Sequence, residues 1–142
     1  MRFQSLITAL MLAGITLGLA TAVPAQTSQR RVIEVTMSEF KYEPNQIEFR
    51  EGETVVLKLN NVGPRFVHNI SSRYWLNISL TIRGDVRQGV SEDRRWVALD
   101  PGKSGEVEFV AQGRGSFAIL CSIFDHASRG HTGAFFVRPG PQ

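Results

Sequence analysis

Apolar and polar residues alternate along most of this chain with a period of two, the pattern of strands that bury one face. The alternation is clearest at residues 33–37, where Ile33, Val35 and Met37 share one side. It recurs at 47–49, 55–59, 66–70, 78–82, 107–109 and 117–121, and a last apolar run at 134–137 closes the chain. Glycine- and proline-containing turns separate the runs, and no long helical pattern interrupts them. The pattern predicts an all-β chain folded as a two-sheet sandwich.

One stretch departs from this alternation. Residues 74–96 show no steady period, so they are compatible with either a short helix or a long loop between two strands. Three large aromatic residues lie here, Tyr74, Trp75 and Trp96. We interpret them as packing residues rather than as part of a functional site.

The N-terminus has the pattern of an export signal. Arg2 precedes an apolar run from Leu6 to Ala22, and small residues at 23–25 come before a polar segment. The sequence therefore predicts a secretory signal peptide at residues 1–25 and a single domain at 26–142. A retained membrane anchor is the alternative, although the run is short for a span of about 20 residues. No later segment is apolar enough to span, so we expect no membrane span in the mature chain.

Charge gives no sign of a nucleic-acid partner. The net charge is +3, and the basic residues are dispersed, with Arg30-Arg31 and Arg94-Arg95 as the doublets. A dispersed pattern is typical of a solvated surface and not of a nucleic-acid groove, so we expect no nucleic-acid binding. Docking to an acidic protein stays compatible with this charge.

The residues that carry chemistry are few. The chain has one cysteine and three histidines: Cys121, His126 and His131 near the C-terminus, and His68 in the middle. A lone cysteine in an exported chain forms no internal disulfide and needs protection from oxidation. One thiolate with two or three imidazoles suits copper in particular, and zinc is the alternative metal. A buried inert cysteine fits less well, because two histidines follow Cys121 at short intervals. A thiol enzyme with Cys121 as nucleophile and His126 as base also fits less well, because no oxyanion motif accompanies the pair.

A β-sandwich can bring these segments together. His68 falls on a strand, Cys121 at the end of another, and His126 on the loop that follows. A thiolate and two imidazoles held by a rigid frame suit both Cu(I) and Cu(II), so that electron transfer needs little rearrangement.

The chain resembles the cupredoxin family over nearly the whole predicted domain. The resemblance rests on Asn61-Val62-Gly63 leading to His68-Asn69, and on Gly115 to Cys121 followed by the histidine loop. It implies a Greek-key β-sandwich that binds one mononuclear copper ion. It also implies that His68, Cys121 and His126 are the equatorial ligands. Asn69 matches the family's outer asparagine, whose amide ties the two ligand segments together near the sulfur.

His131 is the main departure from the family pattern, because it stands where the family has an axial methionine. His131 as a fourth ligand, His131 beside an open position, and His131 as a surface residue are the three interpretations. A bound imidazole favours Cu(II), so it should lower the reduction potential and shift the colour away from blue.

The sequence thus predicts an exported, periplasmic, monomeric copper protein that carries single electrons and is not an enzyme. The alternative is a copper-binding or tolerance protein that sequesters or delivers copper without a redox role. A redox partner protein or a copper-handling protein is the expected partner.

Overall fold

The computed structural model describes residues 29–140, and the signal peptide predicted at 1–25 lies outside the described residues. Eleven strands and one short 3₁₀ helix make up this part of the chain. The strands are β1 (Arg30–Ser38), β2 (Lys41–Glu43), β3 (Gln46–Arg50), β4 (Thr54–Asn61), β5 (His68–Ser72), β6 (Thr81–Gly84), β7 (Arg87–Ser91), β8 (Arg94–Leu99), β9 (Ser104–Val110), β10 (Gly115–Leu120) and β11 (Thr132–Arg138). The helix η1 (Arg73–Trp75) follows β5 directly.

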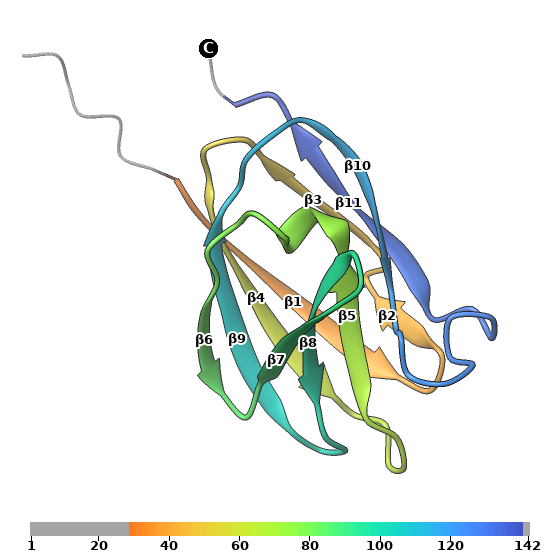
Figure 1. The fold of residues 1–142 in the computed structure, drawn as a ribbon. Coiled ribbons are helices and arrows are strands. Elements are labelled where there is room, and N and C mark those ends of the chain that lie inside the picture. Colours follow the sequence, from red (N-terminus) through yellow and green to blue (C-terminus); the bar gives the residue numbers. More distant parts are fainter. Residues whose placement is uncertain (1–28, 141–142) are drawn as a thin grey trace, which may run out of the picture.

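The strands form two sheets that face each other (Figure 1). The first has the order β2-β1-β4-β9-β6, and the second has the order β3-β11-β10-β5-β8-β7. The β1–β4 and β3–β11 pairs are parallel, and the other pairs are antiparallel. The predicted two-sheet Greek-key β-sandwich is therefore confirmed.

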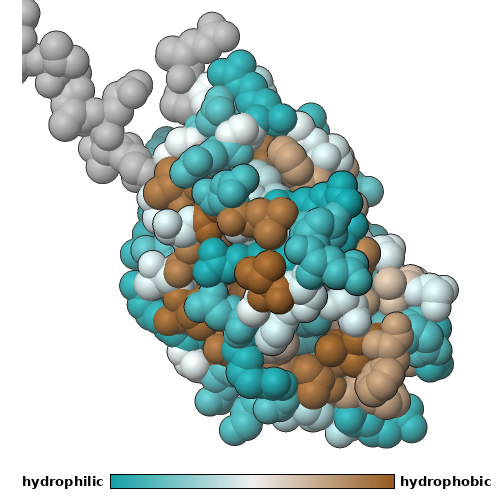
Figure 2. Space-filling model, in the orientation of Figure 1, coloured by the Kyte–Doolittle hydropathy of each residue, from teal (hydrophilic) through white to brown (hydrophobic). Residues whose placement is uncertain are grey.

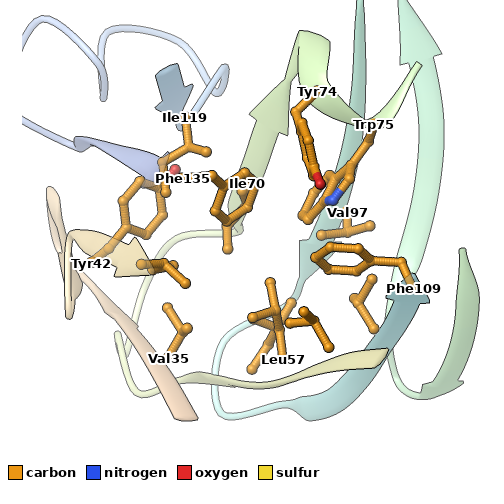
Figure 3. Packing of buried hydrophobic residues seen from close by; sticks show 14 of the residues in the cluster. Val35, Tyr42, Leu57, Ile70, Tyr74, Trp75, Val97, Phe109, Ile119 and Phe135 are labelled. Carbon is orange, nitrogen blue, oxygen red and sulfur yellow. The ribbon is translucent and has the colours of Figure 1, made fainter. Parts of the chain in front are cut away.

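The period-two pattern places alternate residues in the core between the sheets. Val35 and Met37 on β1 are fully buried, as are Leu57 and Leu59 on β4. Figure 3 shows Tyr42 on one side of the labelled core residues, with Trp75 and Phe109 on the other. The core is thus aliphatic along the strands and rich in aromatic rings toward η1.

The irregular stretch at 74–96 resolves into short elements rather than a long loop. It holds the end of η1, all of β6 and β7, and the first residues of β8. The apolar run at 78–82 is only partly a strand, because Ile78 is buried ahead of β6 and its N–H donates to the carbonyl of Trp75. Tyr74 and Trp75 are buried in the core, as expected of packing residues, whereas Trp96 is half-buried and packs against Gly89.

The outer surface mixes the two kinds of side chain. Figure 2 shows hydrophobic residues in small groups separated by hydrophilic ones on the face drawn. Among the described residues, no helix has both the length and the apolar character that a membrane crossing requires.

Candidate metal centre

The four candidate ligands come from one end of the second sheet. His68 is the first residue of β5, and Cys121 directly follows β10. His131 directly precedes β11, and His126 lies on the loop that joins β10 to β11. The hydrogen-bonded pair Leu120–Ser71 joins β10 to β5, which brings Cys121 toward the start of β5. Strand pairing alone therefore gathers residues that are far apart in the sequence.

All four side chains meet in one buried cluster. One potential ligand atom from each of His68, Cys121, His126 and His131 lies within 4.8 Å of the others. The Cys121 Sγ lies 3.4 Å from Nδ1 of His126. The His68 ring centroid lies 4.7 Å from that of His131 and 5.1 Å from that of His126. The structure thus brings together every metal-ligand candidate that the sequence singled out, and His131 is no surface residue, since it is fully buried.

The loop between Cys121 and His131 is held by its own backbone. The Cys121 N–H donates to the His131 carbonyl at 3.0 Å, and the His131 N–H donates to the His126 carbonyl at 3.0 Å. The His126 N–H donates in turn to the Ile123 carbonyl at 3.0 Å. These bonds tie three candidate ligands to one another through the main chain, so their side chains are pre-organised.

Two glycines flank His131 and act differently. Gly130 has a φ of +103°, a conformation that other residues rarely adopt, so it turns the chain into β11. Gly133 instead allows close approach, because a Cβ there would lie 2.1 Å from the Asn45 carbonyl oxygen. The sharp turn before β11 therefore belongs to Gly130, and Gly133 lets β11 lie against the β2–β3 connection.

Asn69 joins the His68 segment to the cysteine segment. Its side-chain amide donates to Ser122 Oγ at 2.9 Å, and its Oδ1 accepts the Ser122 N–H at 2.8 Å. Its backbone N–H donates to Cys121 Sγ at 3.4 Å. A hydrogen bond to the sulfur stabilises negative charge there, and the paired amide bonds fix the distance between the two segments.

Aromatic side chains from the β1–β2 turn, from β2 and from the loop before β5 also contribute to the site, which the sequence did not predict. Phe40 packs edge-on against His126 with ring centroids 5.2 Å apart, and Phe66 does the same at 5.3 Å. Tyr42 packs against His131 at 4.2 Å, and its hydroxyl donates to the Asn69 carbonyl at 2.6 Å. These side chains reach the site from the first sheet and from the loop before β5. No periodicity in the sequence signals contacts of this kind.

Unpartnered polar atoms gather at this site. Among the described residues, both ring nitrogens of His68 and both of His131 are buried without a hydrogen-bond partner. Burying such atoms unpaired is costly, about 1–3 kcal/mol for each. A metal ion that accepts imidazole lone pairs would remove part of that cost, so the residues present fit a bound metal. One thiolate and three imidazoles form a set that can hold one copper ion.

The electrostatics of the cluster favour neutral imidazoles. Burial, followed by the neighbouring His68 and His126, lowers the pKa of His131 to about 3. Burial also lowers the pKa of His68, with His126 acting in the same direction. A neutral imidazole has the free lone pair that a metal needs. Burial raises the pKa of Cys121, and the Asn69 N–H partly opposes this, so the metal-free site favours the thiol.

Asp125, the other potential ligand on the loop, stays outside the cluster. Its carboxylate lies 4.0 Å from the Arg129 guanidinium and is largely exposed. Asp125 is therefore a solvated loop acid.

Comparisons with known proteins identify the kind of domain. The model of a family described as a cupredoxin-like domain matches residues 8–132 of this chain. No curated protein is significantly similar to it in sequence. Auracyanin from Roseiflexus castenholzii, in its dithionite-reduced form, is similar in structure, with a TM-score of 0.57 and 19% identity over 79% of this chain and 100% of that one.

Two further solved structures share the fold. Auracyanin A, a blue copper protein from Chloroflexus aurantiacus, has a TM-score of 0.57 and 15% identity, covering 77% of this chain and 99% of that one. A multicopper oxidase from Campylobacter jejuni has a TM-score of 0.57 and 12% identity, covering 90% of this chain and 34% of that one. At these identities the likeness establishes the fold alone, which a small copper protein and a large oxidase have in common.

Proposed function

Because this chain belongs to the cupredoxin-like domain family, we propose that it is an exported copper protein that carries single electrons. The observation that carries the proposal is the buried cluster of one cysteine and three histidines within 4.8 Å. Cys121, His68 and His126 would hold the ion, with His131 as a fourth ligand. Bound copper supplies a centre that changes charge by one electron.

The residues of the chain provide what such a centre requires. The main-chain bonds of the 121–131 loop fix the ligand positions, so that little rearrangement accompanies a change of charge. Phe40 and Phe66 cover His126, which is only 2% exposed, and they exclude water from the cluster. A dry, rigid site favours rapid electron exchange over chemistry on a substrate.

Adding Cu(II) to the metal-free protein tests this function. We expect one equivalent to bind and to give an intense thiolate-to-copper band. The band should bleach with a mild reductant and return with an oxidant over repeated cycles. Copper binding without reversible bleaching would contradict electron transfer.

A second function, copper retention, is favoured by one observation. His131 is fully buried in the cluster as a third imidazole, and an added nitrogen donor stabilises Cu(II). A sequestering or delivery protein would hold Cu(II) tightly and resist reduction. Measuring the reduction potential separates the two functions, because a carrier must lie within the range of its redox partner.

Export follows from the sequence and is part of the proposal. We expect residues 1–25 to be removed in the periplasm, leaving a domain that starts at Gln26. Sequencing the N-terminus of the periplasmic product measures this. A product that retains Met1 and partitions with membranes would contradict it.

A further inference from the structure

The imidazoles of the metal centre have neighbours in the segment 39–42, which is the β1–β2 turn and the start of β2. Phe40 packs on His126 and Tyr42 packs on His131. The third, Glu39, is different because it is an acid. Its Oε1 is buried and has no hydrogen-bond partner, an arrangement that is costly for a carboxylate.

Gly63 shows what Glu39 faces. A Cβ built on Gly63 would lie 3.0 Å from Glu39 Oε1 and 3.0 Å from Nε2 of His68. The unpartnered carboxylate oxygen and the unpartnered imidazole nitrogen therefore border the same small space, which exists because residue 63 has no side chain.

The other polar group at this place already has partners. Asn61 Oδ1 accepts the Gly63 N–H at 3.0 Å, and its amide donates to the carbonyls of Phe66 and Leu99, each at 2.9 Å. Glu39 Oε1 is thus the unpartnered acceptor beside this space. It is not hydrogen-bonded to His68 Nε2 in this structure, so a small side-chain movement is needed to bring the two together.

We propose that Glu39 is a positioning residue whose carboxylate accepts the Nε2–H of His68 and so directs the lone pair of Nδ1 toward Cys121, His126 and His131. This deepens the proposed function and rests on it for the metal. A carboxylate behind a ligating histidine fixes its tautomer and makes it a stronger donor. Its negative charge also offsets the extra positive charge of Cu(II) over Cu(I), so it favours the oxidised state.

The first test needs no metal. In the metal-free protein, nitrogen NMR of the His68 ring should show the tautomer with the proton on Nε2. Glu39→Gln keeps an acceptor oxygen and should keep that tautomer, whereas Glu39→Leu should give a mixture of the two. An unchanged tautomer in Glu39→Leu would overturn the proposal, and near-ultraviolet circular dichroism checks that the variant is folded.

The second test compares copper affinities. Glu39→Leu should lower the affinity for Cu(II) by about 10- to 100-fold, with a smaller loss for Cu(I). Each tenfold fall in the ratio of the Cu(II) affinity to the Cu(I) affinity raises the reduction potential by about 59 mV for one electron. Glu39→Gln should also raise it, because the charge is lost. Glu43→Gln is the matched control, since Glu43 is 72% exposed and paired with Lys41, and it should leave both quantities unchanged.

Gly63→Ala tests the geometry separately. Its methyl group would separate the Glu39 carboxylate from the His68 ring, so it should reproduce the Glu39→Leu result with Glu39 still present. If Glu39→Leu changes the copper spectrum but not the metal-free tautomer, Glu39 binds the metal directly and the proposal fails. If the wild-type protein gives no thiolate band with copper, the proposed function fails, while the tautomer of His68 still tests Glu39.

Discussion

The two ends of the sandwich satisfy their buried groups in different ways. Near η1, Tyr74, Trp75, Phe109 and Phe49 pack ring against ring at centroid distances of 5.5–6.1 Å. The Tyr74 hydroxyl accepts the Gln112 N–H there, with the Trp75 indole nitrogen as the buried atom that lacks a partner. At the opposite end, two complete imidazoles lack partners among the described residues.

This contrast separates the stability of the fold from the chemistry of the site. The aromatic end is complete as apolar packing and needs no ligand. The metal end is held by strand pairing and loop hydrogen bonds, yet it leaves donor atoms unpaired. Mutations at the two ends should therefore affect different measurements.

The largest expected effect is at the metal end. Cys121→Ser should abolish the intense visible band of the copper-loaded protein, because the band requires a thiolate on copper. Absorption spectroscopy measures this, and far-ultraviolet circular dichroism should show an unchanged fold. An intense band that persists in the variant would mean that Cys121 is not a ligand.

At the aromatic end, Phe109→Ala should lower the free energy of unfolding by about 3–5 kcal/mol, because it leaves a cavity among buried rings. Denaturant unfolding of the metal-free and copper-loaded forms should show the same loss in both. Phe109 lies on β9 of the first sheet, which carries no candidate ligand, so the visible spectrum should not change. A shifted spectrum would show that the two ends are coupled.

The pH dependence of the free energy of unfolding of the metal-free protein also distinguishes the metal end from the aromatic end. The pKa of His131 is about 3 in the folded state, against about 6.5 for an unfolded histidine, so the unfolded chain binds more protons between these values. Stability is therefore full above about pH 6.5 and falls toward pH 3, by about 1.4 kcal/mol per pH unit for one proton. The lowered pKa of His68 acts in the same direction.

Denaturant unfolding from about pH 8 to about pH 4 measures this slope. Phe109→Ala should move the whole curve downward without changing its slope, since it removes no titrating group. His131→Met should flatten the curve. A wild-type curve that is flat below pH 6.5 would contradict the lowered pKa.

The smallest expected effect is a shift in the reduction potential and spectrum of the copper site when His131 is replaced. His131→Met replaces an imidazole with a softer thioether, which favours Cu(I), so the potential should rise and the spectrum should move toward that of a blue site. His131→Ala should also raise the potential but weaken Cu(II) retention, because a donor is lost. Voltammetry and absorption measure both. Wild-type values in both variants would mean that His131 is not a ligand.

The ligand candidates could be found from the sequence because the chain has so few. One cysteine and three histidines leave little choice once a sandwich is expected. Glu39, Phe40 and Tyr42 were missed because they reach the site across the two sheets, and such contacts leave no local pattern. β7 and the start of β8 were missed because their side chains are little buried: β7 is an edge strand, and the first three residues of β8, which pairs with it, are only half-buried. Without a buried face the period-two signal disappears.

The short pairing between β5 and β10 also affects the order of folding. Asn69 and Cys121 are 52 residues apart in sequence, and the two strands share the register pair Leu120–Ser71. Closing so long a segment is slow relative to forming hairpins. The four candidate ligands therefore meet only after the second sheet has assembled. In a refolding experiment with copper present, the rate at which the thiolate-to-copper band appears measures that late step.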